Sequence, residues 1–206
     1  MSEKKEKKVS ETFSYCFLDK FEIADYENRH IYINCEIDED VIDNSVYRIM
    51  DYNRQDKGKP IEERQPIVVY LNSLGGSVSD GYALIDAIQL SETPVYTVNL
   101  GVCFSMGLLI FMAGHKRYAM PHSEFLLHDG QIGEINSTAK VKDRLEFESI
   151  QIEGMTKEYI LKQSKIDEDL FEKNYRKEWY FLPKEGKDIG IVDYVIGEDC
   201  KLADII

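Results

Sequence analysis

The chain has 206 residues, of which 43% are hydrophobic and 31% charged, an ordinary balance for one sizeable globular domain. Its formal net charge of −13 argues against a nucleic-acid-binding protein, because phosphate backbones select basic surfaces. The four cysteines are far apart and form no CxxC pair, so neither a structural zinc site nor a disulfide framework is predicted.

The chain starts with a charged, lysine-rich stretch, and we expect residues 1–20 to form a mobile arm. This stretch lacks the apolar segment of a secretory signal, and the longest apolar run, LLIFMAG, is too short to cross a bilayer. We therefore expect a protein of the reducing cytoplasm with no membrane partner. Residues 21–200 are expected to form a single domain and residues 201–206 a carboxy-terminal tail.

Runs of β-branched and aromatic residues alternate along the chain with segments of helical spacing. This alternation predicts an α/β fold with a mostly parallel sheet. Strands are predicted in HIYINCEI (30–37), PIVVYLNS (66–73), PVYTVNL (94–100) and EFLLH (124–128), and helices in 38–53, in the segment carrying Leu84, Ile85 and Ile88, and in 105–114.

Residues 138–164 contain no proline and show a weak helical stripe, which Glu148 and Gly154 interrupt. A helix of this length would extend about 40 Å, which is longer than a small domain needs. We therefore expect it to project from the domain and to pack on another copy of the chain.

The segment NSLGGSV (72–78) lies where a buried strand ends and a helix begins. Paired glycines allow a tight turn there whose backbone N–H groups point at an anion, either a phosphate or the oxyanion of an acyl-transfer intermediate. A phosphate is disfavoured because the chain has neither GxxxxGK[ST] nor GxGxxG, and a plain structural turn is the remaining alternative.

Ser105 lies at a second junction between a strand and a helix, in the run GVCFSMG. A serine in the first turn of a helix exposes its Oγ near free backbone N–H groups, as a nucleophile does, although a small residue can also serve close helix packing. Cys103 is a rival nucleophile, for which we expect the role of a buried apolar filler.

A nucleophilic serine needs a base, and His128 ends the predicted strand EFLLH. That position places an imidazole at the carboxyl edge of a parallel sheet, where α/β active sites collect. A structural, hydrogen-bonded histidine is the alternative, which a serine and an N–H cradle nearby make less favourable.

Three stretches occur together in one order: YLNSLGGSVSDGYALIDAI, GVCFSMGLLIFMAGHKRYAMPHSEFLLH and DIGIVDYV. From about Arg29 to Val195, the chain resembles the proteolytic subunit of the Clp protease, ClpP. The resemblance implies a crotonase-like fold of repeated β-β-α units with a protruding helical handle at about residues 131–170. It also implies heptameric rings stacked as a tetradecamer around a chamber, and an AAA+ Clp ATPase partner.

By position, Ser105 resembles the family's nucleophile and His128 its general base. The backbone N–H groups of Gly76 and Met106 resemble the two donors of the oxyanion hole. The resemblance implies no metal and no cofactor, because ATP would be used only by the separate unfoldase.

The third member of the catalytic triad departs from the family, which has an aspartate there. Counting back from Gly190 without gaps places Glu178 at this position, and Asn174 is the alternative. A carboxylate can neutralise a histidine cation, whereas an amide can only fix its tautomer. Leu74 also replaces a common proline, so the chain reads as a divergent member.

The resemblance implies a serine endopeptidase of protein quality control, which hydrolyses peptides and unfolded proteins inside an oligomeric chamber. A weak or inactive ring subunit that modulates an active paralogue is the first alternative, motivated by the altered third position. The second is a crotonase-type enzyme acting on acyl-CoA thioesters, whose chemistry would not need Ser105 and His128 together.

Overall fold

The structure is a computed structural model that describes residues 17–133 and 135–205. Its elements, in chain order, are α1 (Phe17–Glu27), β1 (His30–Ile33), η1 (Ile42–Val46), α2 (Tyr47–Gln55), η2 (Ile61–Glu63), β2 (Ile67–Ser73), α3 (Val78–Gln89), β3 (Val95–Phe104), α4 (Met106–Met112), β4 (Lys116–Ala119), β5 (Glu124–Leu127), α5 (Thr138–Phe147), η3 (Glu148–Ile152), α6 (Glu153–Gln163), α7 (Glu168–Asn174), β6 (Trp179–Phe181), α8 (Pro183–Asp188), β7 (Tyr194–Val195) and η4 (Leu202–Asp204).

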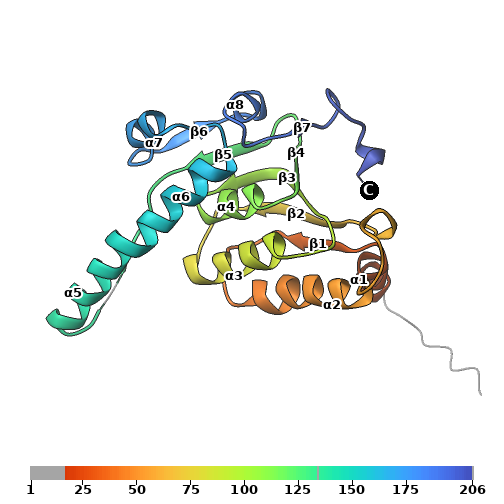
Figure 1. Ribbon diagram of the computed structural model, residues 1–206, viewed down its shortest axis with the longest axis horizontal. Coiled ribbons are helices and arrows are strands. Elements are labelled where there is room, and N and C mark those ends of the chain that lie inside the picture. The colour runs from red at the N-terminus through yellow and green to blue at the C-terminus, as the bar shows by residue number, and fades with distance from the viewer. Residues whose placement is uncertain (1–16, 134, 206) are drawn as a thin grey trace, which may run out of the picture.

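The described strands form one seven-stranded sheet, on which the helices are arranged as Figure 1 shows. Strands β1, β2, β3, β4 and β7 lie side by side in that order, β5 also pairs with β3, and β6 pairs with β5. These pairs are parallel except for the antiparallel pair of β5 and β6. The predicted α/β class with a mostly parallel sheet is therefore confirmed.

Strand β2 is the centre of the core, as its continuous apolar run predicts. Its residues Ile67 to Leu71 are all buried, and helix α3 covers the sheet with the predicted Leu84, Ile85 and Ile88. Ser77 caps the start of helix α3: its Oγ accepts a hydrogen bond from the Asp80 N–H and so satisfies one free donor of the first turn. The same buried strand therefore leads directly into the glycine-pair turn.

Strand β3 is longer than predicted and changes its partner halfway. Its first half pairs with β4 at Tyr96 to Asn99, and its second half pairs with β5 at Val102 to Phe104. The predicted strand ended at residue 100, whereas β3 continues to Phe104. The extension brings Ser105 next to the carboxyl end of β5, which is the strand that ends directly before His128.

The structure describes part of each of the two segments expected at the ends of the domain. Helix α1 begins at Phe17, so residues 17–20 belong to a helix and not to the expected arm, whose residues 1–16 lie outside the described residues. In the expected tail, Leu202–Asp204 form a short 3-10 helix and Ile205 is buried. Ile205 packs in a small apolar cluster with Tyr118 and Ile196, which explains why this segment is held on the domain.

The segment 138–164 forms a helical projection, which we define as α5, η3 and α6. Figure 1 shows it extending away from the sheet, as its length predicts. The five-residue stretch η3, of π-helical geometry, begins at Glu148, where the apolar stripe is interrupted. Several large apolar side chains of the projection are exposed, among them Leu145, Phe147, Ile150 and Met155.

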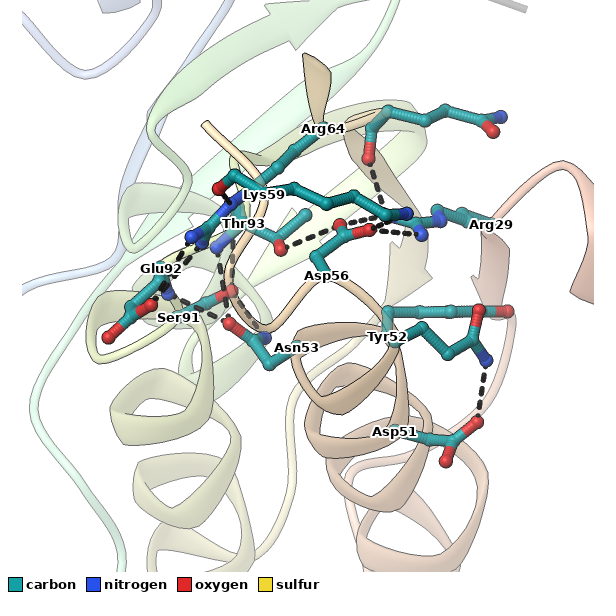
Figure 2. A network of polar contacts seen from close by, with 12 residues as sticks. Arg29, Asp51, Tyr52, Asn53, Asp56, Lys59, Arg64, Ser91, Glu92 and Thr93 are labelled. Carbon is teal, nitrogen blue, oxygen red and sulfur yellow. Dashed lines mark hydrogen bonds and ion pairs between the residues drawn. The ribbon is translucent and has the colours of Figure 1, made fainter. Parts of the chain in front are cut away.

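A buried ion pair connects the end of α2 to the start of the sheet (Figure 2). The fully buried Asp56 carboxylate accepts hydrogen bonds from the Arg29 guanidinium (Nη2 to Oδ1, 2.9 Å), Lys59 Nζ (2.8 Å) and Thr93 Oγ1 (2.9 Å). Arg29 itself has a positive φ of 60°. The hydrogen bond from Arg29 holds the pKa of Asp56 well below its usual range.

Two further findings concern membrane-spanning helices and the state of the cysteines. No helix in 17–133 or 135–205 is long and apolar enough to cross a bilayer. Within the same ranges Cys35, Cys103 and Cys200 are free thiols.

Candidate active site

Ser105 lies at a strained turn between β3 and α4. Its φ of 52° and ψ of −123° make it one of two described residues other than glycine with a positive φ. The turn is held on both sides, because Ser105 N–H donates to the Leu126 carbonyl of β5 (2.9 Å) and the Ser105 carbonyl accepts from Leu108 N–H (3.0 Å). Backbone strain of this kind is kept where the structure over-determines it and is concentrated at functional sites. The same sharp strand-to-helix turn exposes the nucleophile of many hydrolases.

The turn that contains Gly75 and Gly76 lies so close to neighbouring backbone that only glycine fits at both positions. A Cβ on Gly75 would lie 2.8 Å from the Ser105 Cβ and 2.9 Å from the Phe104 carbonyl oxygen. A Cβ on Gly76, whose φ is 147°, would lie 2.2 Å from the carbonyl oxygen of Ile37. Ile37 pairs with this turn through two backbone hydrogen bonds, to the Gly75 carbonyl (2.8 Å) and from Ser77 N–H (2.6 Å). The turn is therefore a built feature and not an arbitrary loop.

Two backbone donors remain free beside Ser105. In the described part of the chain, the N–H groups of Gly76 and Met106 have no protein acceptor. Both residues line the cavity of about 360 Å³ that Ser105 and His128 also line. Unpaired N–H groups in a partly enclosed pocket can receive a developing negative charge.

The His128 ring is oriented by Glu178. His128 follows β5 and Glu178 precedes β6, and the antiparallel register pairs their neighbours Leu127 and Trp179. His128 Nδ1 lies 2.9 Å from Glu178 Oε1, and that hydrogen bond is the main cause that lowers the pKa of Glu178. An ionised carboxylate only accepts, so Nδ1 carries the hydrogen and Nε2 of a neutral ring is left to accept a proton.

Asn174, the other candidate for the third position, is used elsewhere. Its Nδ2 donates to the Leu170 carbonyl of its own helix, α7, over 3.0 Å. Of the two candidates, the structure brings only Glu178 to His128.

Ser105 and His128 share the cavity but are not hydrogen-bonded to each other. Among the described residues, no hydrogen bond joins the Ser105 Oγ to the His128 ring. Such bonds are often long in unliganded sites and shorten when substrate binds. Proton transfer here requires the Oγ and Nε2 to come within hydrogen-bonding distance.

Cys103, the rival nucleophile, is fully buried, as expected for an apolar filler. Burial raises the pKa of its thiol well above the usual value, so a thiolate is strongly disfavoured there. As for metals, no group of three metal-ligating side chains occurs in residues 17–133 and 135–205.

The middle of the helical projection forms one wall of the cavity, which was not predicted from the sequence. Arg144 and Glu148 form an ion pair on this wall, and Glu153 pairs with Arg176 over 3.2 Å. In the sequence, these charges on a helix are typical of a solvated face. Only the path of the chain shows that they line the same cavity as Ser105 and His128. The cavity therefore has charged side chains of the projection on this side.

Tyr180 is a second residue that sequence reasoning missed. Its hydroxyl donates to Glu178 Oε2 over 3.1 Å, so both oxygens of this carboxylate are bonded. The i, i+2 spacing of Glu178 and Tyr180 was the available signal, because side chains two positions apart in an extended segment share a face.

Serine hydrolases use an exposed serine, an oriented histidine and backbone N–H donors, and residues of these three kinds lie around this cavity. Residues 19–199 match the family model described as Clp protease, and the chain belongs to the Clp protease family. The resemblance expected from the sequence is therefore confirmed.

Similar proteins carry the same family description in their names. The chain is 29% identical over 170 residues to the ATP-dependent Clp protease proteolytic subunit 3 of Parasynechococcus marenigrum (strain WH8102), covering 82% of each chain. It is 28% identical over 171 residues to the ATP-dependent Clp protease proteolytic subunit 1 of Frankia casuarinae, covering 82% of this chain and 77% of that one. At this identity the chain is a divergent member.

Proposed function

We propose that this protein is a serine endopeptidase that hydrolyses peptides and unfolded proteins. The observation that carries the proposal is the convergence on one cavity of Ser105, held at a strained turn, and His128, bound to Glu178 over 2.9 Å. Family membership supports the same chemistry.

In the proposed mechanism, His128 Nε2 takes the proton of Ser105 Oγ as that oxygen attacks the peptide carbonyl. The carboxylate of Glu178 stabilises the imidazolium that forms, and the N–H groups of Gly76 and Met106 bind the oxyanion. His128 then gives its proton to the leaving amine. Water, activated by the same ring, releases the acyl group from the serine.

The proposal includes assembly into heptameric rings stacked as a tetradecamer around a chamber. The exposed apolar residues of the helical projection support this, because an isolated projection would leave them in water. We propose that the projection is the handle of a crotonase-like, ClpP-type fold. We further propose a cytoplasmic location, no cofactor in the subunit, and a separate AAA+ Clp ATPase that supplies unfolded chains.

A second candidate, a ring subunit with little activity, is favoured by one observation: Ser105 Oγ and the His128 ring are not hydrogen-bonded in the described residues. Acyl-CoA chemistry is less well supported. The arginine on the cavity wall, Arg144, is already paired with Glu148 and is not free to bind CoA phosphates.

Hydrolysis of a fluorogenic peptide by the assembled protein tests the proposal. We expect turnover by the wild type and a loss of at least about 10³-fold in Ser105→Ala. Ser137→Ala is the matched control, because this exposed serine makes no capping hydrogen bond at the start of α5. If the wild type and Ser105→Ala are equally inert while both assemble, the scaffold interpretation replaces this one.

A further inference from the structure

The Glu178 carboxylate needs more support than an aspartate would in its place. Its side chain has one more rotatable bond and is 56% exposed, whereas the His128 side chain is 19% exposed. An exposed glutamate moves among many rotamers unless contacts restrict it. To stay bonded to His128 Nδ1, the Glu178 carboxylate therefore needs a second contact that restricts its rotamers.

Strand β6 provides that second contact by its alternation. Trp179 and Phe181 point to the core, where Phe181 stacks on Phe125 of β5. Glu178 and Tyr180 lie on the opposite face, because successive side chains alternate along a strand. The Tyr180 hydroxyl reaches Glu178 Oε2 at 3.1 Å, while Oε1 lies 2.9 Å from His128 Nδ1.

The Tyr180 ring is itself oriented by the strand that carries the serine. It packs edge-to-face on Phe104, with ring centroids 5.7 Å apart, and Phe104 directly precedes Ser105. The contacts thus run from Phe104 through Tyr180 and Glu178 to His128. Of these four residues, only His128 lines the cavity in the described part of the chain.

We propose that Tyr180 is a positioning residue, whose hydroxyl holds the Glu178 carboxylate in the orientation that the His128 ring requires. The inference rests on the proposed function, because an oriented histidine matters only where it acts as a base. Tyr180 acts through Glu178 and touches no reacting atom.

Tyr180→Phe removes the hydroxyl and keeps the ring against Phe104. Since Tyr180 is 56% exposed, we expect this variant to fold and assemble like the wild type. Its kcat on a fluorogenic peptide should fall about tenfold with little change in KM, as for the loss of one hydrogen bond to a charged group. Tyr47→Phe is the matched control, because this tyrosine is equally exposed, at 58%, and lies at the start of α2.

The pH profile separates positioning from the two other roles that Tyr180 could have. If the hydroxyl positions Glu178, its loss moves the carboxylate from the imidazolium, and the acid limb of kcat/KM shifts to lower pH. If it only disperses the carboxylate charge, the limb shifts to higher pH. If only the ring matters, neither kcat nor the limb changes. Either of these last two results overturns the proposal.

Two further measurements complete the test, and the second of them is independent of catalysis. In the Glu178→Ala background, Tyr180→Phe should have no additional effect, because the residue it positions is absent. Titration of the histidine ring signals by NMR should show the same shift to lower pH in Tyr180→Phe. A wild type without peptidase activity would reject the proposed function, whereas an unmoved ring titration would reject the role of Tyr180.

Discussion

The buried Asp56 gives the sharpest stability prediction. Its side chain is fully buried, and the side chain of its partner Arg29 is only 8% exposed. Asp56→Asn keeps the shape of the side chain but removes the charge, which leaves the Arg29 cation buried without a counter-ion. Breaking a buried pair from one side costs about 3 to 5 kcal/mol of unfolding free energy.

For a chain of this size, that loss corresponds to a fall in Tm of roughly 6 to 20 °C. Differential scanning calorimetry measures it, with protein concentration fixed because assembly also raises Tm. Asp51→Asn is the matched control on the same helix, since its ion pair with Arg54 is exposed and such pairs contribute about 0 to 1 kcal/mol. Equal Tm values for the Asp56 and Asp51 variants would refute the reasoning.

The pH dependence provides a second readout for Asp56. Its folded-state pKa is depressed, chiefly by the Arg29 hydrogen bond, so its contribution to stability is fully present above the unfolded value of about 3.9. The contribution is lost as the pH falls from there through the folded-state pKa. We therefore expect the Tm difference between the wild type and Asp56→Asn to shrink only below about pH 4. A difference that already disappears between pH 7 and pH 5 would contradict the assignment.

The remaining predictions concern the site. Gly76→Ala should lower kcat on a peptide by about 10² to 10³, because the new Cβ would displace an oxyanion donor from its place against Ile37. Gly58→Ala is the control, since Gly58 also has a positive φ but has open space around it, and this variant should keep full activity. Similar losses of activity in both variants would reject the donor role of Gly76. Glu178→Gln should lower kcat by about 10³ to 10⁴ through loss of the carboxylate charge, whereas Asn174→Ala should change kcat little. The reverse ranking of these two variants would assign the third position to Asn174.

Local patterns along the chain predicted much of the sheet and the two turns. The buried strand β2 and the glycine-pair turn depend on the residues of the segment itself. Their local sequence is therefore enough to predict them. The turn at Ser105 was predicted in the same way, although its positive φ was not. Counting from Gly190 pointed to Glu178, and the structure places its carboxylate on His128.

Contacts between distant segments could not be predicted from local pattern. Arg29 and Asp56 are 27 positions apart, and each alone looks like an exposed charge. The wall formed by Arg144, Glu148 and Glu153 depends on how the helical projection leaves the domain. Short strands such as β7 have too few residues for alternation to show, and their partners alone define them.

Mapping a fluorophosphonate adduct by mass spectrometry tests the central claim most directly. If Ser105 is a nucleophile activated by His128, the wild type should gain one adduct per chain, located on Ser105, and His128→Ala should gain almost none. An assembled wild type that takes up no adduct at saturating probe, or one that carries it on another residue, would contradict the account.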